Sequence, residues 1–257
     1  MQSNAHYSTK ARSRLLTLNF IDQKMINLQT YQQLGHADHG WLDARHHFSF
    51  AGYHNPKRMG FGKLRVINDD IIAAGSGFGM HQHHDMEIIT YVRTGAITHK
   101  DDKGNQGRTV AGDVQVMSAG TGIFHSEFNL ENMETTIYQI WIEPSELGVS
   151  PRWETATFPK QLPDNQLSLL VSGKGDAPLS INSDARIYAG QLSKNTTVTQ
   201  TIEHQAYVLI SDGQIKLDSL FMNKGDGAQV TEQTTVNIKA LNDGTEVLLI
   251  DVPGLFG

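Results

Sequence analysis

Three histidines and one glutamate form the pattern in this sequence that is most typical of metal binding. His81 and His83 are separated by one residue in a segment that predicts a β-strand, where alternate side chains share a face, so the two imidazoles are expected to act together. His125 and Glu127 have the same spacing further along the chain. If the two segments lie on neighbouring strands, three imidazoles and a carboxylate converge. We therefore predict that these four side chains bind one metal ion.

The donor types restrict the ion and the chemistry. The sequence contains twelve histidines and no cysteine, so any metal is held by nitrogen and oxygen alone. Disulfides, zinc–thiolate sites, iron–sulfur clusters and cysteine nucleophiles are all excluded. Imidazole and carboxylate ligands suit several divalent ions of the first transition row, and the ligand types do not choose among them. We expect iron(II), with zinc, copper, cobalt, nickel and manganese as the alternatives.

Other histidines in the same half of the chain are interpreted as bystanders. His84 is predicted to point away from the two histidines that precede it, toward the surface or behind the ligands. His46 and His47 are interpreted as hydrogen-bonded structural residues, although one of them could line a cavity. His36 and His39 stand among glycines and imitate a second metal site, but no converging partner accompanies them. The sequence therefore predicts one metal site rather than two.

Tryptophan and serine residues near this pattern are also assigned structural roles. Trp41, Trp141 and Trp153 are interpreted as packing residues rather than as platforms for a substrate. Ser126 lies beside His125 but lacks the strand–turn–helix context of a serine nucleophile. Catalysis by a Ser-His-Asp triad is therefore excluded.

Length, composition and charge restrict the class of protein. The chain has 257 residues, of which 39% are hydrophobic, enough for one large β domain or two smaller domains with real cores. The formal net charge of −6 argues against a nucleic-acid backbone as the main partner, since duplex-binding proteins usually carry a basic face. No apolar run approaches the roughly 20 residues that span a bilayer. We therefore expect a soluble, cytoplasmic protein without a direct nucleic-acid or membrane partner.

The elements that position these side chains are predicted to be short strands. After residue 60 the apolar residues recur with period two, and no long amphipathic helix is evident. Turns rich in glycine and aspartate separate the strands, for example the hairpin loop at residues 101–107. In the first half of the chain this pattern predicts strands at residues 63–68, 87–92, 96–100, 113–117 and 136–142. Such spacing is typical of a β-sandwich or a β-barrel.

A second β-rich block is predicted after a proline-containing linker at residues 151–163. Its expected strands lie at residues 167–171, 185–192, 197–202, 206–210, 214–218, 234–241 and 246–252. We therefore divide the chain into a domain at residues 27–150, the linker, and a domain at residues 164–257. Residues 1–26 are interpreted as a peripheral extension outside the fold rather than as a signal peptide, and Met25 is an alternative start of the protein.

The two blocks share a faint internal repeat. The matching segments are residues 91–97 (Tyr-Val-Arg-Thr-Gly-Ala-Ile) and residues 207–215 (Tyr-Val-Leu-Ile-Ser-Asp-Gly-Gln-Ile). Each reads as a strand, a turn with glycine and a second strand. Upstream of the tyrosine, the first copy holds His81 and His83 where the second holds Thr197 and Thr199. Only the first copy would then have kept a metal site; the alternative is a chance similarity between two β-hairpins.

Several longer strings in the first block resemble those of a known family. They are Phe48-Ser49-Phe50, Arg65-Val66-Ile67-Asn68-Asp69-Asp70, Gly77-Phe78-Gly79, Asp85-Met86-Glu87-Ile88 and the segment from Met117 to Glu127. The spacing of the histidines, of Glu87 and of Gly95 is also similar to the two cupin motifs. Together these strings resemble the pirin family of the cupin superfamily, in particular its bacterial quercetin 2,3-dioxygenases. The resemblance is strong over residues 27–158 and holds only in outline in the second block.

The resemblance implies an all-β bicupin, with two cupin barrels of the jelly-roll type in one chain. The first barrel would hold the metal ion, and the second would have lost it. The family's metal ligands fall on His81, His83, His125 and Glu127. Cupins in general take the carboxylate from the first motif, here Glu87, whereas the pirin pattern takes it from the glutamate after the last histidine. We favour Glu127 as the ligand, with Glu87 as the alternative.

The function that the resemblance implies is metal-dependent dioxygenation of flavonols such as quercetin. The partners would be the flavonol and O2, Glu127 would be the base that removes the proton of the C3 hydroxyl, and carbon monoxide would be released as the central ring opens. The alternative is a metal-bound, redox-sensitive regulator of a protein partner, as eukaryotic members of the family are thought to be. A third interpretation is a storage or structural cupin. We expect the chain to act as a monomer.

Overall fold

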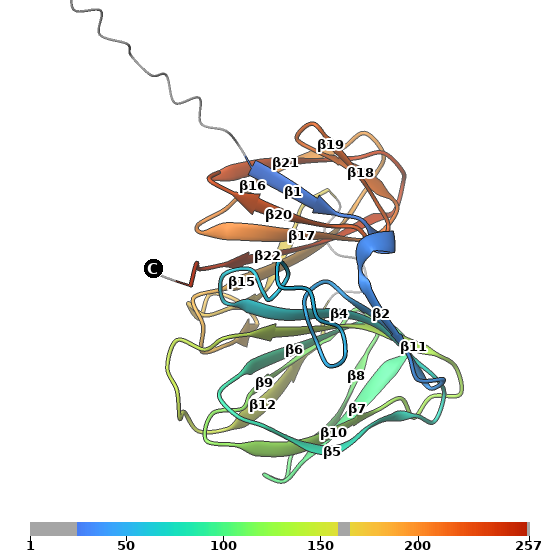
Figure 1. Ribbon diagram of the computed structural model, residues 1–257, viewed down its shortest axis with the longest axis vertical. Helices are drawn as coiled ribbons and strands as arrows, with labels where there is room; N and C mark the ends of the chain where they lie inside the picture. Colours follow the sequence, from blue (N-terminus) through green and yellow to red (C-terminus); the bar gives the residue numbers. More distant parts are fainter. Residues whose placement is uncertain (1–24, 159–164, 256–257) are drawn as a thin grey trace, which may run out of the picture.

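Alternation of buried and exposed residues along short strands builds this protein almost entirely from β-sheet. The computed structural model describes residues 25–158 and 165–255. Within these residues the strands form four sheets, a large and a small one from each half of the chain (Figure 1). Each pair of sheets is a barrel, so the prediction of an all-β chain with two cupin barrels is confirmed.

The N-terminal barrel is formed by the strands from β2 to β12. Their bounds are β2 (Gly35–Asp38), β3 (Leu42–His46), β4 (Leu64–Ile72), β5 (Gly77–His83), β6 (Glu87–Thr94), β7 (Ala96–Asp101), β8 (Gln106–Val110), β9 (Val114–Ser118), β10 (Ile123–Phe128), β11 (Thr135–Ile142) and β12 (Arg152–Ala156). The large sheet has the strand order β12-β9-β6-β11-β4-β3-β2, and the small sheet has the order β5-β10-β7-β8.

The C-terminal barrel takes one strand from the beginning of the described chain and the rest from its second half. Their bounds are β1 (Met25–Gln29), β13 (Ser168–Ser172), β14 (Leu179–Ser180), β15 (Arg186–Leu192), β16 (Thr197–Thr201), β17 (Gln205–Asp212), β18 (Gln214–Leu217), β19 (Leu220–Asn223), β20 (Gly227–Thr231), β21 (Thr235–Ala240) and β22 (Thr245–Val252). The large sheet has the order β1-β20-β17-β22-β15-β13-β14, and the small sheet has the order β16-β21-β18-β19. A short 3-10 helix, η1 (Tyr31–Gln33), follows β1. Among the described residues no helix has the length and apolar character that a membrane crossing requires.

The two barrels have equivalent strand orders. The run β9-β6-β11-β4 corresponds to β20-β17-β22-β15, and the small sheets correspond strand by strand. The turns after β6 and β17 both require glycine. Gly95 (φ 72°) and Gly213 (φ 79°) have left-handed backbone, and a Cβ atom on either would collide with the hydroxyl of Thr135 or Thr245, respectively. The repeat predicted from the sequence is therefore present in the fold.

Two edge strands lie where the sequence predicted no structure. β1 pairs with β20, so Met25 and Ile26, assigned to the extension, are part of the C-terminal sheet. β12 pairs with β9, so residues 152–156 of the expected linker complete the N-terminal sheet. Each is a short strand at a sheet edge. Because it pairs with only one neighbouring strand, its period-two pattern of apolar residues is weak. Residues 1–24 of the predicted extension and 159–163 of the predicted linker lie outside the described residues.

The large sheets pack against each other and leave the small sheets on the outside (Figure 1). One buried cluster spans both halves of the chain and includes Tyr138 and Ile140 from β11 together with Tyr207 and Leu209 from β17. Burial of this apolar surface is the main force that joins the barrels. The opposite face of each large sheet is therefore turned toward the interior of its own barrel, where a site can form.

Candidate metal site and cavity

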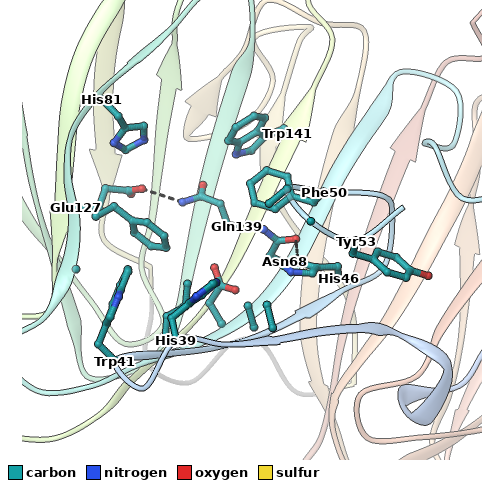
Figure 2. Close-up of a pocket in the computed structure, with 18 of the residues that line it drawn as sticks. His39, Trp41, His46, Phe50, Tyr53, Asn68, His81, Glu127, Gln139 and Trp141 are labelled. Carbon is teal, nitrogen blue, oxygen red and sulfur yellow. Dashed lines mark hydrogen bonds between the residues drawn. The ribbon is translucent and has the colours of Figure 1, made fainter. Parts of the chain in front are cut away.

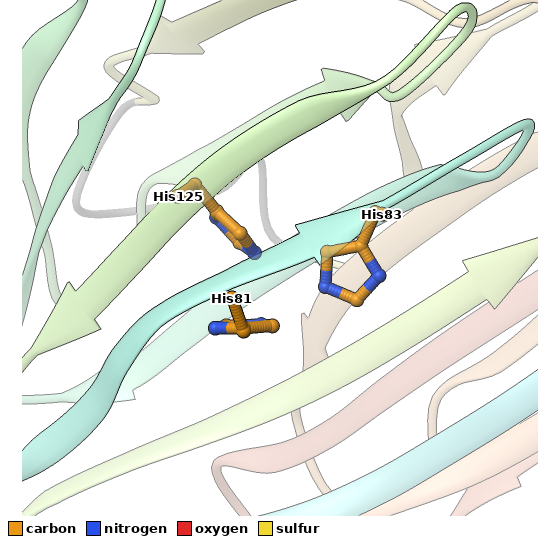
Figure 3. Close-up of side chains that lie close together, drawn as sticks. All are labelled: His81, His83 and His125. Carbon is orange, nitrogen blue, oxygen red and sulfur yellow. The ribbon is translucent and has the colours of Figure 1, made fainter.

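The three histidines predicted as ligands lie together on β5 and β10. These strands are antiparallel neighbours in the small sheet, and His81 lies directly across from His125. The ring centroid of His81 is 4.5 Å from that of His125 and 4.8 Å from that of His83 (Figure 3). The centroids of His83 and His125 are 5.0 Å apart. One ligand atom from each residue lies within 4.8 Å of the other two. The convergence predicted from the two period-two spacings is present.

Hydrogen bonds determine which ring nitrogen two of these histidines present. His81 Nδ1–H donates to the carbonyl oxygen of Gly79 (2.7 Å), which leaves Nε2 as the acceptor. His99 Nε2–H donates to Asp101 Oδ2 (3.1 Å), so the His99 Nδ1 atom accepts from His125 Nδ1–H (3.4 Å). The Nε2 atom of His125 is then an acceptor, and it is buried without a hydrogen-bond partner. Both rings therefore have a lone pair available for a cation.

The protonation state of the cluster also suits a metal ion. Burial, followed by the charges of the nearby His125 and His81, lowers the pKa of His83 to about 4. Burial likewise lowers the pKa of His125 to about 3, with His81 and His99 as the next causes. Neutral imidazole is the form that binds a metal, so near neutral pH no proton has to be displaced from these rings. The residues present fit a divalent ion with nitrogen ligands.

His99 and Asp101 hold the His125 ring from behind. The carboxylate of Asp101 accepts hydrogen bonds from the backbone N–H groups of Lys103 and Asn105 (2.9 Å each). Burial opposes ionisation of Asp101, but hydrogen bonds from Asn105, His99 and Lys103 keep its pKa below the ordinary value. The indole of Trp153 stacks on the His99 ring at 4.7 Å between centroids. His99 and Asp101 were not predicted as part of the site, although their period-two spacing on a strand close to the ligands was the available signal.

Glu127 follows His125 by two residues on β10, and its carboxylate is bound by three side chains. Oε1 accepts from Gln115 Nε2 (2.6 Å) and from the Thr90 hydroxyl (2.9 Å), and Oε2 accepts from Gln139 Nε2 (2.8 Å) (Figure 2). Within the described residues, the cluster that could hold a metal at this place contains the three histidines but not Glu127. A carboxylate oxygen has two lone pairs, so Oε2 keeps one for a cation or a proton.

The three partners of Glu127 belong to a row of polar residues that crosses the large sheet. Gln115 on β9 lies opposite Thr90 on β6, Thr90 lies opposite Gln139 on β11, and Gln139 lies opposite Asn68 on β4. Residues directly opposite in a sheet point to the same side, so the row faces the barrel interior. His46 on β3 continues it, with Nδ1 2.8 Å from Asn68 Oδ1. The available signal was a polar residue inside each apolar strand, but only strand order shows that these residues meet.

Glu87, the other carboxylate that the sequence left open, faces away from this row. On β6 the side chains of Ile88 and Thr90 point into the barrel, whereas Glu87 and Ile89 point to the opposite face, and Ile89 packs in the cluster between the barrels. Glu87 Oε2 accepts the hydroxyl of Ser118 (2.7 Å), and burial raises its pKa. Of the two glutamates, only Glu127 lies on the same side of the barrel wall as the histidines.

The histidines and Glu127 line a cavity of about 940 Å³. Five aromatic side chains contribute to its wall: Trp41, Phe50, Tyr53, Phe78 and Trp141 (Figure 2). Among the lining residues that the structure describes, none is a lysine or an arginine. A cavity of this size with aromatic walls and no lysine or arginine in its described lining suits a small aromatic ligand without a strong negative charge.

Two of the tryptophans have a wider role than the sequence indicated. Trp41 and Trp141 pack against the core, as predicted, and they also line the cavity. Trp141 also contacts His83 edge to face, with ring centroids 4.8 Å apart. Trp153 is a packing residue, as predicted. This difference has no signal in the sequence, because a tryptophan that packs and one that lines a cavity have the same apolar neighbours.

The histidines interpreted as bystanders occupy three kinds of position. His46 lines the cavity, while His47 is buried between the barrels with Nδ1 3.0 Å from the hydroxyl of a tyrosine on β17. His36 and His39 are exposed at the cavity, and neither is in a metal-binding cluster within residues 25–158 and 165–255. His84 is exposed and does not line the cavity, so the prediction that it points away is confirmed.

A second group of metal-type ligands lies on the surface of the C-terminal barrel. It contains Asp184, Glu203 and His204, all exposed. Lys174 and Arg186 already pair with these carboxylates: Arg186 Nη1 is 2.8 Å from Glu203 Oε1, and Lys174 Nζ is 3.8 Å from Asp184 Oδ1. Because the negative charge is balanced, this group is an ion-pair network.

Two family models match this chain. Residues 27–142 match the model described as pirin, and residues 169–252 match the model described as quercetinase C-terminal cupin domain. The matches coincide with the N-terminal barrel and the C-terminal barrel, respectively.

Known proteins align over almost the whole chain. A protein of Caulobacter vibrioides named pirin-like protein is 48% identical over 88% of this chain and 99% of its own length. A quercetin 2,3-dioxygenase of Escherichia coli K12 is 42% identical over 89% of this chain and 99% of its own length. The crystal structure of the bacterial pirin YhhW from Escherichia coli in complex with nickel(II) matches with a TM-score of 0.84 and 41% identity, over 90% of this chain and 100% of that one.

Proposed function

Since this chain belongs to the pirin family, we propose that it is a metal-dependent dioxygenase that opens the central ring of flavonols such as quercetin with O2 and releases carbon monoxide. One observation carries the proposal: three histidines, two of them with a free ring nitrogen set by hydrogen bonding, lie on the wall of an aromatic cavity. The name of the Escherichia coli relative supports the same reaction.

The proposed ligands of the metal are His81, His83, His125 and Glu127. Their neutral imidazoles and the free lone pair on Glu127 Oε2 support this set. The ion that we propose is iron(II), and nickel(II) is supported by the complex of the related Escherichia coli pirin. The same ligand types would also accept zinc, copper, cobalt or manganese. When bound, the ion supplies Lewis acidity toward the C3 hydroxyl of the flavonol and redox chemistry toward O2.

Glu127 is the proposed base. Its carboxylate accepts the proton of the C3 hydroxyl, while Gln115, Thr90 and Gln139 hold the carboxylate in one orientation.

The aromatic residues of the cavity bind and shield the substrate. Trp41, Phe78 and Trp141 offer ring surfaces for a flat molecule, and their apolar area replaces water around it. Exclusion of water protects the electron-rich flavonol anion from reprotonation until O2 reacts with it. Both oxygen atoms of O2 enter the ring-opened product.

The test is turnover of quercetin by the metal-loaded protein, with carbon monoxide measured directly. The wild-type protein is expected to consume quercetin and O2 and to release carbon monoxide, and Glu127→Gln is expected to lower kcat by roughly 10²- to 10⁴-fold. Glutamine preserves the shape of the side chain but accepts no proton under these conditions. If the loaded wild-type protein releases no carbon monoxide from flavonols, the proposed reaction is wrong. If Glu127→Gln keeps full turnover, the assignment of the base is wrong.

A further inference from the structure

Two consecutive aspartates on β4 point to opposite faces of the large sheet. Asp69 faces the C-terminal barrel and forms an ion pair with Arg93. Asp70 faces the interior of the N-terminal barrel and lines the cavity, with only 2% of its surface exposed. Its Oδ1 atom is buried and has no hydrogen-bond partner. One aspartate is therefore paired, and its neighbour presents an unpaired carboxyl oxygen in the cavity wall.

The fold offers no structural reason for a carboxyl group at this place. The residues directly opposite Asp70 are Ala44 on β3 and Ile137 on β11, and neither has a polar side chain. Burying a carboxyl group without a hydrogen bond opposes folding, and buried polar groups in proteins are nearly always paired. A ligand in the cavity would supply the missing partner. A polar group that determines specificity behaves in this way, because its hydrogen bond is made only when the correct ligand is bound.

The surroundings of Asp70 define the kind of ligand. Burial, followed by the charges of Asp69 and Glu127, raises the pKa of Asp70 to about 8, and Arg93 on the far face opposes this shift. The lining residues that the structure describes include no lysine or arginine, so a ligand with a free carboxylate or phosphate finds no counter-charge. A hydroxyl group both donates and accepts, and it can therefore pair with a carboxyl group in either protonation state.

A second polar group strengthens this choice. Asn68 precedes Asp70 by two residues on β4, so both side chains are on the cavity face, and both line the cavity. His46 lies beside Asn68 (Figure 2) and is hydrogen-bonded to its Oδ1 atom. Asp70, Asn68 and His46 form a polar patch on β3 and β4, whereas the partners of Glu127 lie on β6, β9 and β11. The polar row that includes the partners of Glu127 therefore continues across β4 and β3, where Asp70 adds an unpaired carboxyl oxygen beside Asn68.

We propose that Asp70 is a specificity-determining residue, which hydrogen-bonds a ring hydroxyl of the aromatic substrate at a point separate from the histidines and Glu127. The inference rests on the proposed function for the identity of the aromatic substrate. Its consequence is a preference for flavonols with additional ring hydroxyl groups over a flavonol with the C3 hydroxyl alone. Quercetin belongs to the first kind and 3-hydroxyflavone to the second.

The experiment compares these two flavonols on the metal-loaded full-length protein and on two variants. Asp70→Leu removes the polar group but keeps the number and branching of the side-chain heavy atoms, and Asp70→Asn keeps a hydrogen-bonding side chain. Both kcat/KM and the dissociation constant are measured, the latter from quenching of tryptophan fluorescence, since Trp41 and Trp141 line the cavity. Asp70→Leu is expected to weaken quercetin binding and kcat/KM about tenfold and to leave 3-hydroxyflavone unchanged, while Asp70→Asn retains most of the preference.

The matched control is Asp69→Asn, which changes the neighbouring residue on the other face of the sheet. It breaks the ion pair with Arg93 and is expected to lower the melting temperature. The ratio of kcat/KM for quercetin to kcat/KM for 3-hydroxyflavone is expected to stay the same. Asp70→Leu is expected to melt no lower than wild type, because it removes a buried carboxyl oxygen that has no partner. Should this variant fail to fold, Asp70→Ala, which also removes the carboxyl group, takes its place. It is required to lower the ratio of kcat/KM for quercetin to kcat/KM for 3-hydroxyflavone by half or more.

Different outcomes separate this inference from the proposed function. Equal losses for both flavonols, or no change for either, overturn the role of Asp70. A wild-type protein that binds quercetin in preference to 3-hydroxyflavone through Asp70, but releases no carbon monoxide, contradicts the dioxygenase function and supports the specificity site. Binding of neither flavonol by the wild-type protein overturns both.

Discussion

The two barrels of this chain share one strand order and have different interiors. In the N-terminal barrel the pair β5 and β10 places His81 across from His125, and both face a cavity. In the C-terminal barrel the equivalent pair β16 and β21 places Val198 across from Ile238. Ile238 is fully buried in an apolar cluster that Val198 packs against. One barrel therefore presents metal-type ligands to a cavity, while the other is filled with side chains.

This contrast indicates a division of work within one architecture. A filled barrel gains stability from every methyl group that it buries, and it gains most where packing is dense. A barrel with a cavity gives up part of that gain and must also hydrogen-bond its inward polar groups, as Gln115, Thr90 and Gln139 do for Glu127. The large sheets join the two barrels through one core, so the filled barrel stabilises the barrel that carries the site.

The largest expected effect comes from removing a proposed ligand from the N-terminal barrel. His83→Ala leaves two histidines in the cluster, and it is expected to lose stoichiometric metal and quercetin turnover together. Elemental analysis of the purified variant, combined with turnover after metal addition, measures both. His84→Ala is the matched control, because it removes an exposed histidine next in the chain. Full metal content in His83→Ala would show that the ion is held elsewhere.

Truncation in the filled barrel is expected to affect stability rather than metal content. Ile238→Ala creates a cavity in a dense core and should lower the free energy of unfolding by about 2–5 kcal/mol, measured by urea denaturation. His81→Ala in metal-free protein enlarges an existing cavity and should cost less. Thr197→Ala on the exposed face is the control, with a change within about 0.5 kcal/mol. Similar losses for Ile238→Ala and His81→Ala would contradict the contrast between the barrels.

A smaller effect is expected from the residues behind the ligands. His99→Phe keeps the aromatic stack on Trp153 but removes the acceptor for His125 Nδ1–H, so the His125 ring is no longer held in the orientation that presents Nε2. The affinity for metal, measured by competition with a chelator, should fall about 10- to 100-fold. Lys100→Ala, on the exposed face of β7, should leave the affinity unchanged. An unchanged affinity in His99→Phe would reduce His99 to a packing residue.

The smallest effect concerns the pH dependence of the contact between the barrels. Burial, with a contribution from the charge of Arg58, lowers the pKa of His47 to about 3. Unfolded histidine titrates near pH 6.5, so the unfolded chain binds the additional proton first, and stability falls as the pH drops from about 6.5 toward 3. His47→Gln should reduce this slope by up to about 1.4 kcal/mol per pH unit in urea titrations. His84→Gln is the exposed control, and an unchanged slope in His47→Gln would contradict the linkage.

Much of the strand pattern was predictable because it depends on local alternation. The strands that contain residues 87–92 and 136–142 are present with small extensions, and the turn at Gly95 is present as well. The edge strands β1 and β12 were not predicted, because a strand with one neighbour and two partly exposed faces carries little hydrophobic pattern.

Aligning the two halves of the sequence identified the equivalent strands of the barrels but not the exact residue register between them. The internal repeat aligned Thr197 and Thr199 with the two histidines of β5. In the structure both threonines are exposed, and the residue between them that faces inward is Val198. A shift of one residue moves every side chain of a strand to the other face. The residue of β16 that takes the place of a β5 histidine is therefore the apolar Val198 rather than a threonine.

The amino-acid order alone determined that His81 and His83 share one face of a strand. It determined the same for His125 and Glu127 on another strand, because side-chain alternation is a local property of the extended backbone. It also determined that no thiolate takes part, since the chain contains no cysteine. Only strand order and register decided that these faces meet across one barrel, that Glu127 rather than Glu87 faces inward with the histidines, and that Asp70 is buried without a partner. Such contacts join residues far apart in the chain, and they depend on which strands pair and how the sheets pack.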